Sequence, residues 1–138
     1  MAIKFNFNIN GVQGLNGNLN YLKTMVPTAT HERLLDEVNA IMAESLTEVP
    51  RDTNSLADSA FVEDNAGNIT FGYGGNNVKT NPKNGESTED YMLIVHEDLS
   101  VNHPVGKAKF LEDPINRHKV NFESNLIQKI RSIFSFLR

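Results

Sequence analysis

Two helical stripes of apolar residues limit the folds open to this chain of 138 residues. Apolar residues between Leu34 and Val49 recur at spacings of three and four, and charged residues fill the other sides. A second stripe runs from Ile115 to Leu137, with Pro114 placed at about the first helical turn. An amphipathic helix has to bury its apolar face. The sequence therefore predicts two long helices that pack on the rest of the chain.

The first third of the chain predicts a strand and two helices. Alternation of apolar and polar residues over 2–10 predicts a strand with one buried face. Helical spacing continues over 12–26, and we expect this helix to end at Pro27, because proline interrupts helical hydrogen bonding. The helix that carries the first stripe should then begin at a threonine cap, at position 28 or 30, and end at Pro50.

The middle of the chain predicts a hairpin, one further strand and two loops. Residues 60–73 form two short strand patterns around an Asn-Ala-Gly-Asn turn. The apolar run at 91–95 is interpreted as a buried strand, with a short helix as the alternative. The polar segment 74–89 predicts a long exposed loop or a hairpin arm, and 99–109 predicts a second loop. The expected fold is a single α+β domain over 1–138, with a small antiparallel sheet packed against two or three helices and long loops.

Composition excludes several classes of protein. The formal net charge is −4 and the isoelectric point about 5.5, which disfavours a free-standing DNA-binding protein. The chain has no cysteine, so disulfides, thiolate metal sites and thiol nucleophiles are excluded. No apolar run approaches the ~20 residues of a membrane-spanning helix, and no signal-peptide pattern precedes the first strand. We therefore expect no membrane association.

One cluster has the side chains of a metal site. His96, Glu97 and Asp98 are consecutive, and His103 follows shortly after. Imidazole and carboxylate groups bind zinc or harder divalent ions, although the spacing matches no helical His-Glu-x-x-His motif. We interpret the cluster as the polar end of a buried strand. A small metal-dependent hydrolase remains the alternative.

Two other features have plainer explanations than catalysis. Asp52 has no histidine or second carboxylate tied to it by spacing, and we expect it, or Thr53 or Ser55, to cap a short helical turn. Lys107 and Lys109 could contact nucleic acid, but two lysines are a weak signal on an acidic chain. The sequence predicts no catalytic residues, no metal and no cofactor.

Four segments resemble the bacteriophage tail-completion family, also described as head–tail joining or minor tail and capsid proteins. They are FNFNINGVQGLNGNLNYL, VPRDTNSLADSA, EDYMLIVHEDL and HPVGKAKFLEDPI, in the family's order between Phe5 and Ile130. Asn54 stands where the family usually has glycine, and the glycine expected near Asp98 is missing. Asparagine is the next-best residue for a left-handed turn. The matching residues are Val49, Pro50, Asp52, Thr53, Leu56, Ser59, Tyr91, Val95, His96, Glu97, Gly106, Phe110, Leu111 and Pro114.

The resemblance implies a non-enzymatic virion protein that forms a ring, six-fold in the usual case, at the neck between head and tail. The ring would contact the tail terminator and tail tube on one side and the connector or stopper on the other. DNA would pass through its lumen, and assembly would take place in the host cytoplasm. The candidate subunit-interface residues are Phe5, Phe7, Tyr73, Asn76, Asn77, Lys79, His103, Pro104, Lys107 and Phe110.

Two further virion roles fit the same sequence. A tail terminator or a head–tail stopper has a similar build, and the residues do not separate these roles from tail completion. An adaptor that binds DNA directly is a third alternative, and it would show strongly salt-dependent affinity.

Overall fold

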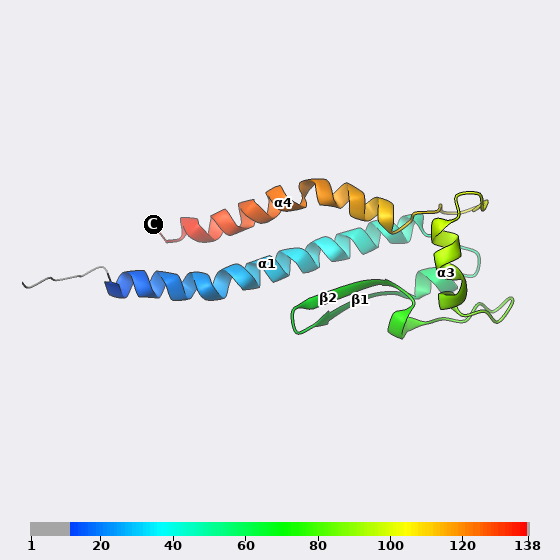
Figure 1. The fold of residues 1–138 in the computed structure, drawn as a ribbon, viewed down its shortest axis with the longest axis horizontal. Coiled ribbons are helices and arrows are strands. Elements are labelled where there is room, and N and C mark those ends of the chain that lie inside the picture. Colours follow the sequence, from blue (N-terminus) through cyan, green and yellow to red (C-terminus); the bar gives the residue numbers. More distant parts are fainter. Residues whose placement is uncertain (1–11, 138) are drawn as a thin grey trace, which may run out of the picture.

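The computed structural model describes residues 12–137, and it has the α+β architecture expected from the sequence. A long helix, α1 (Val12–Glu48), leads through the short α2 (Ser55–Asp58) into an antiparallel hairpin of β1 (Ala60–Asn65) and β2 (Asn68–Tyr73). A 3-10 turn (Gly75–Asn77), α3 (Thr88–Glu97) and α4 (Glu112–Ser135) follow. α4 runs back along α1, and the hairpin lies on the other side of α1 (Figure 1). The strand expected over 2–10 lies outside the described residues.

α1 continues through Pro27, so the expected helix end at this residue is wrong. Pro27 lies within the 37 residues of α1 and removes the hydrogen bond to the Lys23 carbonyl. Both residues are exposed, so water can reach that carbonyl. Nearby threonine hydroxyls also turn back onto the helix, Thr28 onto the Thr24 carbonyl at 2.9 Å and Thr30 onto the Val26 carbonyl at 2.8 Å. The threonines therefore lie inside the helix and do not begin a new one.

A left-handed residue turns the chain from α1 into α2. Asn54 has φ 63°, which confirms the expectation that asparagine replaces glycine in a left-handed turn here. The short helix after it carries no side-chain cap, and Asp52 instead pairs with Lys83, so the capping role expected of Asp52 is wrong. Val49, fully buried just before this turn, joins the end of α1 to the core.

The hairpin has the turn that its sequence predicts. Ala66 and Gly67 both have positive φ, 51° and 91°, as a two-residue hairpin turn of the primed type requires. Asn65 faces Asn68 at the turn, and Ala60 faces Tyr73 at the other end. This register puts Val62, Phe71 and Tyr73 on one face, which packs against the core.

Residues 91–95 belong to α3, so the buried strand expected here is wrong and its helical alternative is right. A capping box starts the helix: the Ser87 hydroxyl accepts from the Glu89 N–H at 3.2 Å, and Asp90 accepts from the Ser87 N–H at 3.1 Å. These two bonds satisfy backbone donors that a helix start otherwise leaves unpaired. Tyr91 and Val95 then face the core.

Two backbone hydrogen bonds hold the loop between α3 and α4 against the end of α1. The Lys107 N–H donates to the Glu48 carbonyl at 2.9 Å, and the Arg51 N–H donates to the Val105 carbonyl at 3.3 Å. Between these bonds lies Gly106, with φ 87°. A Cβ atom at Gly106 would lie 2.6 Å from the backbone of Val49 and Pro50, so only glycine fits.

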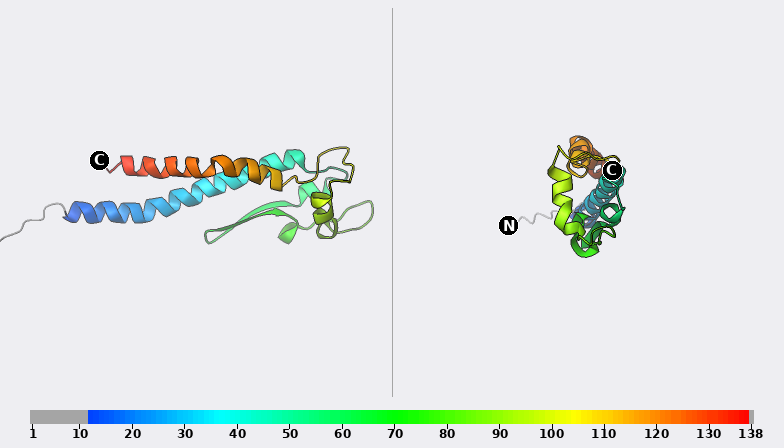
Figure 2. Two further views of the ribbon diagram at one scale, coloured as in Figure 1. Left: turned by 45° about the horizontal axis from the view of Figure 1, so that its top comes forward. Right: turned by 90° about the vertical axis from the view of Figure 1, so that its right-hand side faces the viewer.

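The core forms where α1 ends and all other elements meet. Phe110 is its largest fully buried side chain, and its ring lies edge-on to Tyr73 at a centroid distance of 5.1 Å. The remaining buried members of this cluster are Met42, Val49, Leu56 and Ala57. Residues 12–31 of α1 and the second half of α4 extend beyond this core as a pair of helices (Figures 1 and 2).

Two glycine substitutions test the close contact between Gly106 and the end of α1. Gly106→Ala should destabilise the protein by roughly 3–5 kcal/mol, because it adds a backbone clash to the strain of a left-handed alanine. Gly85→Ala has the same strain, with φ 77°, but meets nothing within 4 Å. It should cost only about 1–2 kcal/mol. Urea unfolding of both variants measures the difference, and equal losses would contradict the close contact at Gly106.

Candidate functional site

The polar segment 74–87 is an ordered arm with a fixed base. The Asn77 amide donates to the carbonyls of Asp58 and Ala60, at 3.0 Å each. Thr88 is fully buried and bonds Lys79 twice, through its own N–H and through its hydroxyl. Hydrogen bonds to α2, β1 and the start of α3 therefore hold the base of this arm in place. Of the two forms expected for this segment, a long exposed loop or a hairpin arm, the structure has the hairpin arm.

The tip of this arm is exposed. Asn81 pairs with Glu86 through the backbone, and Thr80 and Ser87 form a β-bridge. Residues 82–85, Pro-Lys-Asn-Gly, project beyond this pairing into solvent. Lys83 pairs with Asp52 from the turn after α1. The tip is thus polar, held in one orientation, and free to contact a neighbouring molecule.

The loop from Asp98 to Lys109 is the second irregular segment, as expected. Pro104 and Val105 are exposed at its outer side. His103 is half-buried, and its Nε2 atom has no hydrogen-bond partner among the described residues. Lys107 bridges Asp113 at 2.6 Å and Glu48 at 3.2 Å, so its charge ties the loop to both long helices. The bond to Asp113 raises the pKa of Lys107.

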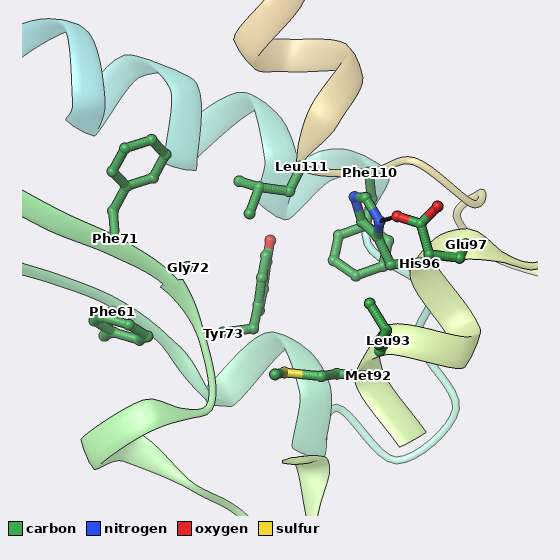
Figure 3. Close-up of a pocket in the computed structure, with 10 residues that line it drawn as sticks. All are labelled: Phe61, Phe71, Gly72, Tyr73, Met92, Leu93, His96, Glu97, Phe110 and Leu111. Atoms are coloured by element: carbon green, nitrogen blue, oxygen red, sulfur yellow. Dashed lines mark hydrogen bonds and ion pairs between the residues drawn. The ribbon is translucent and has the colours of Figure 1, made fainter. Parts of the chain in front are cut away.

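An apolar pocket of about 340 Å³ opens between the hairpin and α3 (Figure 3). The hairpin contributes one wall, α3 contributes the facing wall, and Phe110 and Leu111, just before α4, line the space between them. Figure 3 shows the rings of Phe61 and Phe71 on the hairpin side and Leu93 on the α3 side. The other lining residues are Gly72, Tyr73, Met92, His96, Glu97, Phe110 and Leu111.

Tyr73 and Phe110 belong to the core and not to an outer interface. Tyr73 is 7% exposed and Phe110 2%, so neither offers surface to a neighbouring subunit. The Tyr73 hydroxyl bonds Ser45 at 2.7 Å, and burial raises the pKa of this tyrosine. Their selection as interface residues therefore needs correction. These aromatic residues, although next to polar loops, fill the chain's own core.

The side chains considered as metal ligands from the sequence, His96 to Asp98 and His103, are not arranged around a common centre. His96 accepts the Glu112 N–H through Nε2 at 3.3 Å, so its Nδ1 carries the proton that it donates to Glu97 at 2.8 Å. Asp98 accepts from the Ser100 hydroxyl at 2.6 Å, which lowers the pKa of Asp98. Within residues 12–137, no three histidine, aspartate or glutamate side chains are arranged to hold a metal ion. The hydrolase alternative gains no support from this arrangement.

An ion-pair ladder joins α1 to α4. His118 lies between Glu37, 2.6 Å from its Nδ1, and Glu44, 2.8 Å from its Nε2. Arg117 bonds Glu44 at 2.6 Å and Glu48 at 2.5 Å. With a carboxylate at each ring nitrogen, the imidazolium is favoured, and the bond to Glu37 followed by that to Glu44 raises the pKa of His118. Sequence reasoning missed this ladder. Its signal was three glutamates at spacings of seven and four on one face of α1.

The remaining candidate interface residues divide into surface and structural positions. Asn76, Lys79 and Pro104 are exposed, although the Asn76 amide bonds Glu63 at 3.1 Å. Asn77 and Lys107 hold the chain's own loops in place, as described above. Phe5 and Phe7 lie outside the described residues.

Comparisons with known proteins give this chain no relative. No protein-family model, no curated protein and no solved structure matches it. Among the described helices, none combines the length and the apolar character that a membrane crossing requires.

The ladder predicts a pH-dependent stability. The pKa of His118 is raised above its ordinary value of 6.5, so its contribution is complete below that value. It is lost as the pH rises through the raised pKa. The melting temperature should therefore decline by a few degrees between pH 6 and pH 9, and His118→Gln should remove this decline.

Arg117→Gln is the matched control for this prediction. It removes a neighbouring pair on the same helix, but a guanidinium keeps its charge over this pH range. Arg117→Gln should therefore lower the melting temperature while keeping the decline with pH, because His118 retains Glu37 and Glu44 as partners. Scanning calorimetry in buffers of constant ionic strength gives both values. A pH profile of His118→Gln that matches the wild type would contradict the role of this histidine.

Proposed function

We propose that this protein is a non-catalytic structural subunit of a tailed-bacteriophage neck, which completes the tail and joins it to the head as part of a ring. The proposal starts from the resemblance of four sequence segments to the tail-completion family. The folded arrangement of the matching residues supports it.

The contact of Gly106 with the end of α1 carries the proposal. Gly106 belongs to the fourth family-like segment and Val49-Pro50 to the second, more than fifty residues earlier. A Cβ at Gly106 would lie 2.6 Å from Pro50 N and from Val49 C. A chance likeness of scattered segments gives no reason for their matching residues to touch. A shared fold does, because such residues are kept for close packing.

The other matching residues gather at the same place. Val49, Leu56 and Phe110 are members of one buried cluster, and Tyr91, Val95 and Leu111 pack against it. Ser59 is fully buried, and its hydroxyl bonds the Leu56 carbonyl at 2.7 Å. The resemblance thus consists mainly of core residues, which is what a common architecture would produce.

The surface fits a subunit that meets several neighbours. A ring needs a heterologous interface, in which one patch of a subunit meets a different patch of the next. The chain offers the polar tip at 82–85, the exposed Pro104 loop, and a pair of helices that extends beyond the core. The two loops lie at the end of the molecule where α3 stands, and the pair of helices extends toward the opposite end (Figure 1).

Particles assembled without this protein give the direct test. We expect electron microscopy to show DNA-filled heads beside finished but unattached tails. Overlong tails would indicate a tail terminator instead, and leaking heads a head–tail stopper. Normal infectious particles would contradict all three virion roles.

The arm tip provides a test at the level of single residues. Deleting 76–88, most of the 74–89 segment expected to be a loop or hairpin arm, would also remove the structural contacts of Asn77 and Thr88. Replacing only residues 82–85 by Asn-Gly keeps the Asn81–Glu86 pairing and closes it with a two-residue turn. This variant should melt within a few degrees of the wild type, yet lose most head–tail joining in a complementation assay.

A full-length tip with changed side chains is the control. Lys83→Ala with Asn84→Ala keeps the length of the arm and removes its two longest polar groups. If tip contacts are made by shape and backbone, this control should join particles; if made by side chains, it should fail like the shortened arm. Normal joining by the shortened variant would exclude the tip as a contact.

A further inference from the structure

Charge is divided between the two ends of this elongated molecule. We call residues 12–31 of α1 and 119–137 of α4 the helical arm, and residues 32–118 the body. The body carries sixteen acidic and seven basic residues, and the helical arm carries one acidic and four basic residues. Their formal charges are therefore −9 and +3. The boundary lies at the hairpin turn, where His31 of α1 contacts Asp64 at 2.7 Å.

The helical arm also exposes apolar side chains. Val120, Ile127 and Phe134 repeat every seven residues along α4 and are 78%, 40% and 50% exposed. Residues seven apart lie on one side of a helix, in the spacing of a coiled-coil seam. Leu15 and Leu19 of α1, four residues apart, are also more than half exposed. Beyond the hairpin turn no other described element lies beside these helices (Figure 1).

The body has a matching face on α3. Leu93 and Ile94 are 66% and 60% exposed, Glu89 lies one turn before Leu93, and Glu86 lies just ahead of the helix, with both carboxylates exposed. Glu97, one turn after Leu93, is paired with Lys109. α3 runs across the direction of the long helices and stands at the outside of the molecule when viewed end-on (Figure 2). Its outer side is thus apolar at the centre and acidic at the margin formed by the start of the helix.

We propose that the helical arm of one copy docks on the α3 face of a second copy, head to tail. The apolar seam of α4 in one copy covers Leu93 and Ile94 of the next. The basic residues of the helical arm meet the acidic margin of that α3 face. Arm-to-arm contact would bring basic residues together, and body-to-body contact would bring acidic ones together, so charge favours only the head-to-tail pairing. Repetition of such a heterologous contact closes a ring or extends a filament. The inference deepens the proposed ring function and depends on it for its biological setting.

Charge reversal on each surface tests the pairing. The arm-reversed variant changes the helical arm and is K119E with K129E and R131E. The body-reversed variant changes the acidic margin of α3 and is E86K with E89K. All five side chains are exposed. The control variant, E32K with D36K, makes the same charge change as the body-reversed variant on exposed residues of α1. Far-ultraviolet circular dichroism and melting curves establish that each variant is folded.

Light scattering after gel filtration at low salt measures the assembly. The wild type and the control should exceed the 15.4 kDa of one chain at micromolar concentration. Each reversed variant alone should associate at least tenfold more weakly. An equimolar mixture of the two should regain the assembly. The acidic helical arm of the arm-reversed variant then faces the basic α3 margin of the body-reversed variant.

Several outcomes would overturn this pairing. They are a monomeric wild type, a control as weak as the body-reversed variant, or a mixture that stays monomeric. Since the chain has no cysteine, Ile127→Cys alone reports arm-to-arm contact, and its efficient disulfide dimerisation would also refute the proposal. So would a monomeric wild type that binds duplex DNA through the basic arm. If assembly occurs as expected but particles lacking the protein are normal, the neck function fails and the pairing stands.

Discussion

The backbone contact between Gly106 and the end of α1 determines how the rest of the chain is arranged. It holds the loop after α3 against Val49 and Pro50, and two backbone hydrogen bonds flank it. α4 begins six residues later and therefore has to start where α1 ends. The antiparallel pairing of the two long helices and the position of Phe110 under the hairpin both follow from this single close approach.

The ladder of charges then fixes how far α4 runs along α1. Glu37, Glu44 and Glu48 lie on one face of α1, and His118 and Arg117 fit between them. Sliding α4 by one turn would leave these partly buried carboxylates without partners, which costs more than the pairs themselves contribute. Apolar packing alone would tolerate such a shift more easily, because it is not directional. The polar contacts thus select the register, and the apolar contacts supply most of the stability.

Local signals in the sequence predicted the hairpin and the C-terminal helix, because each depends on neighbouring residues only. The left-handed Asn54 was expected from the family resemblance, in which glycine is usual at this position. Two errors have the opposite origin. Pro27 does not end α1, because an exposed helix can leave one carbonyl to water. The run at 91–95 does not form a strand, because the capping box that starts at Ser87 commits the following residues to a helix. That box was readable as Ser-x-x-Asp before an apolar run, but the strand-like composition of the run outweighed it.

The candidate contact surfaces show the same difference between what neighbouring residues determine and what distant contacts determine. Polarity identified the segments at 74–89 and 99–109 as surface, and their tips are exposed. It could not show that Asn77 and Lys107 are used internally, because those contacts join segments far apart in the sequence.

The helical arm was missed for a related reason. A sequence pattern shows that a helix has an apolar side, but not whether the chain contains enough other elements to cover it. α4 uses Phe122, Leu126 and Ile133 on one side, while Val120, Ile127 and Phe134 lie on another. Two helices lying side by side can bury only one stripe each. The second stripe lies in the part of the molecule with the fewest neighbours, which is why we propose that a second copy covers it, and the segregation of charge favours the body end of that copy.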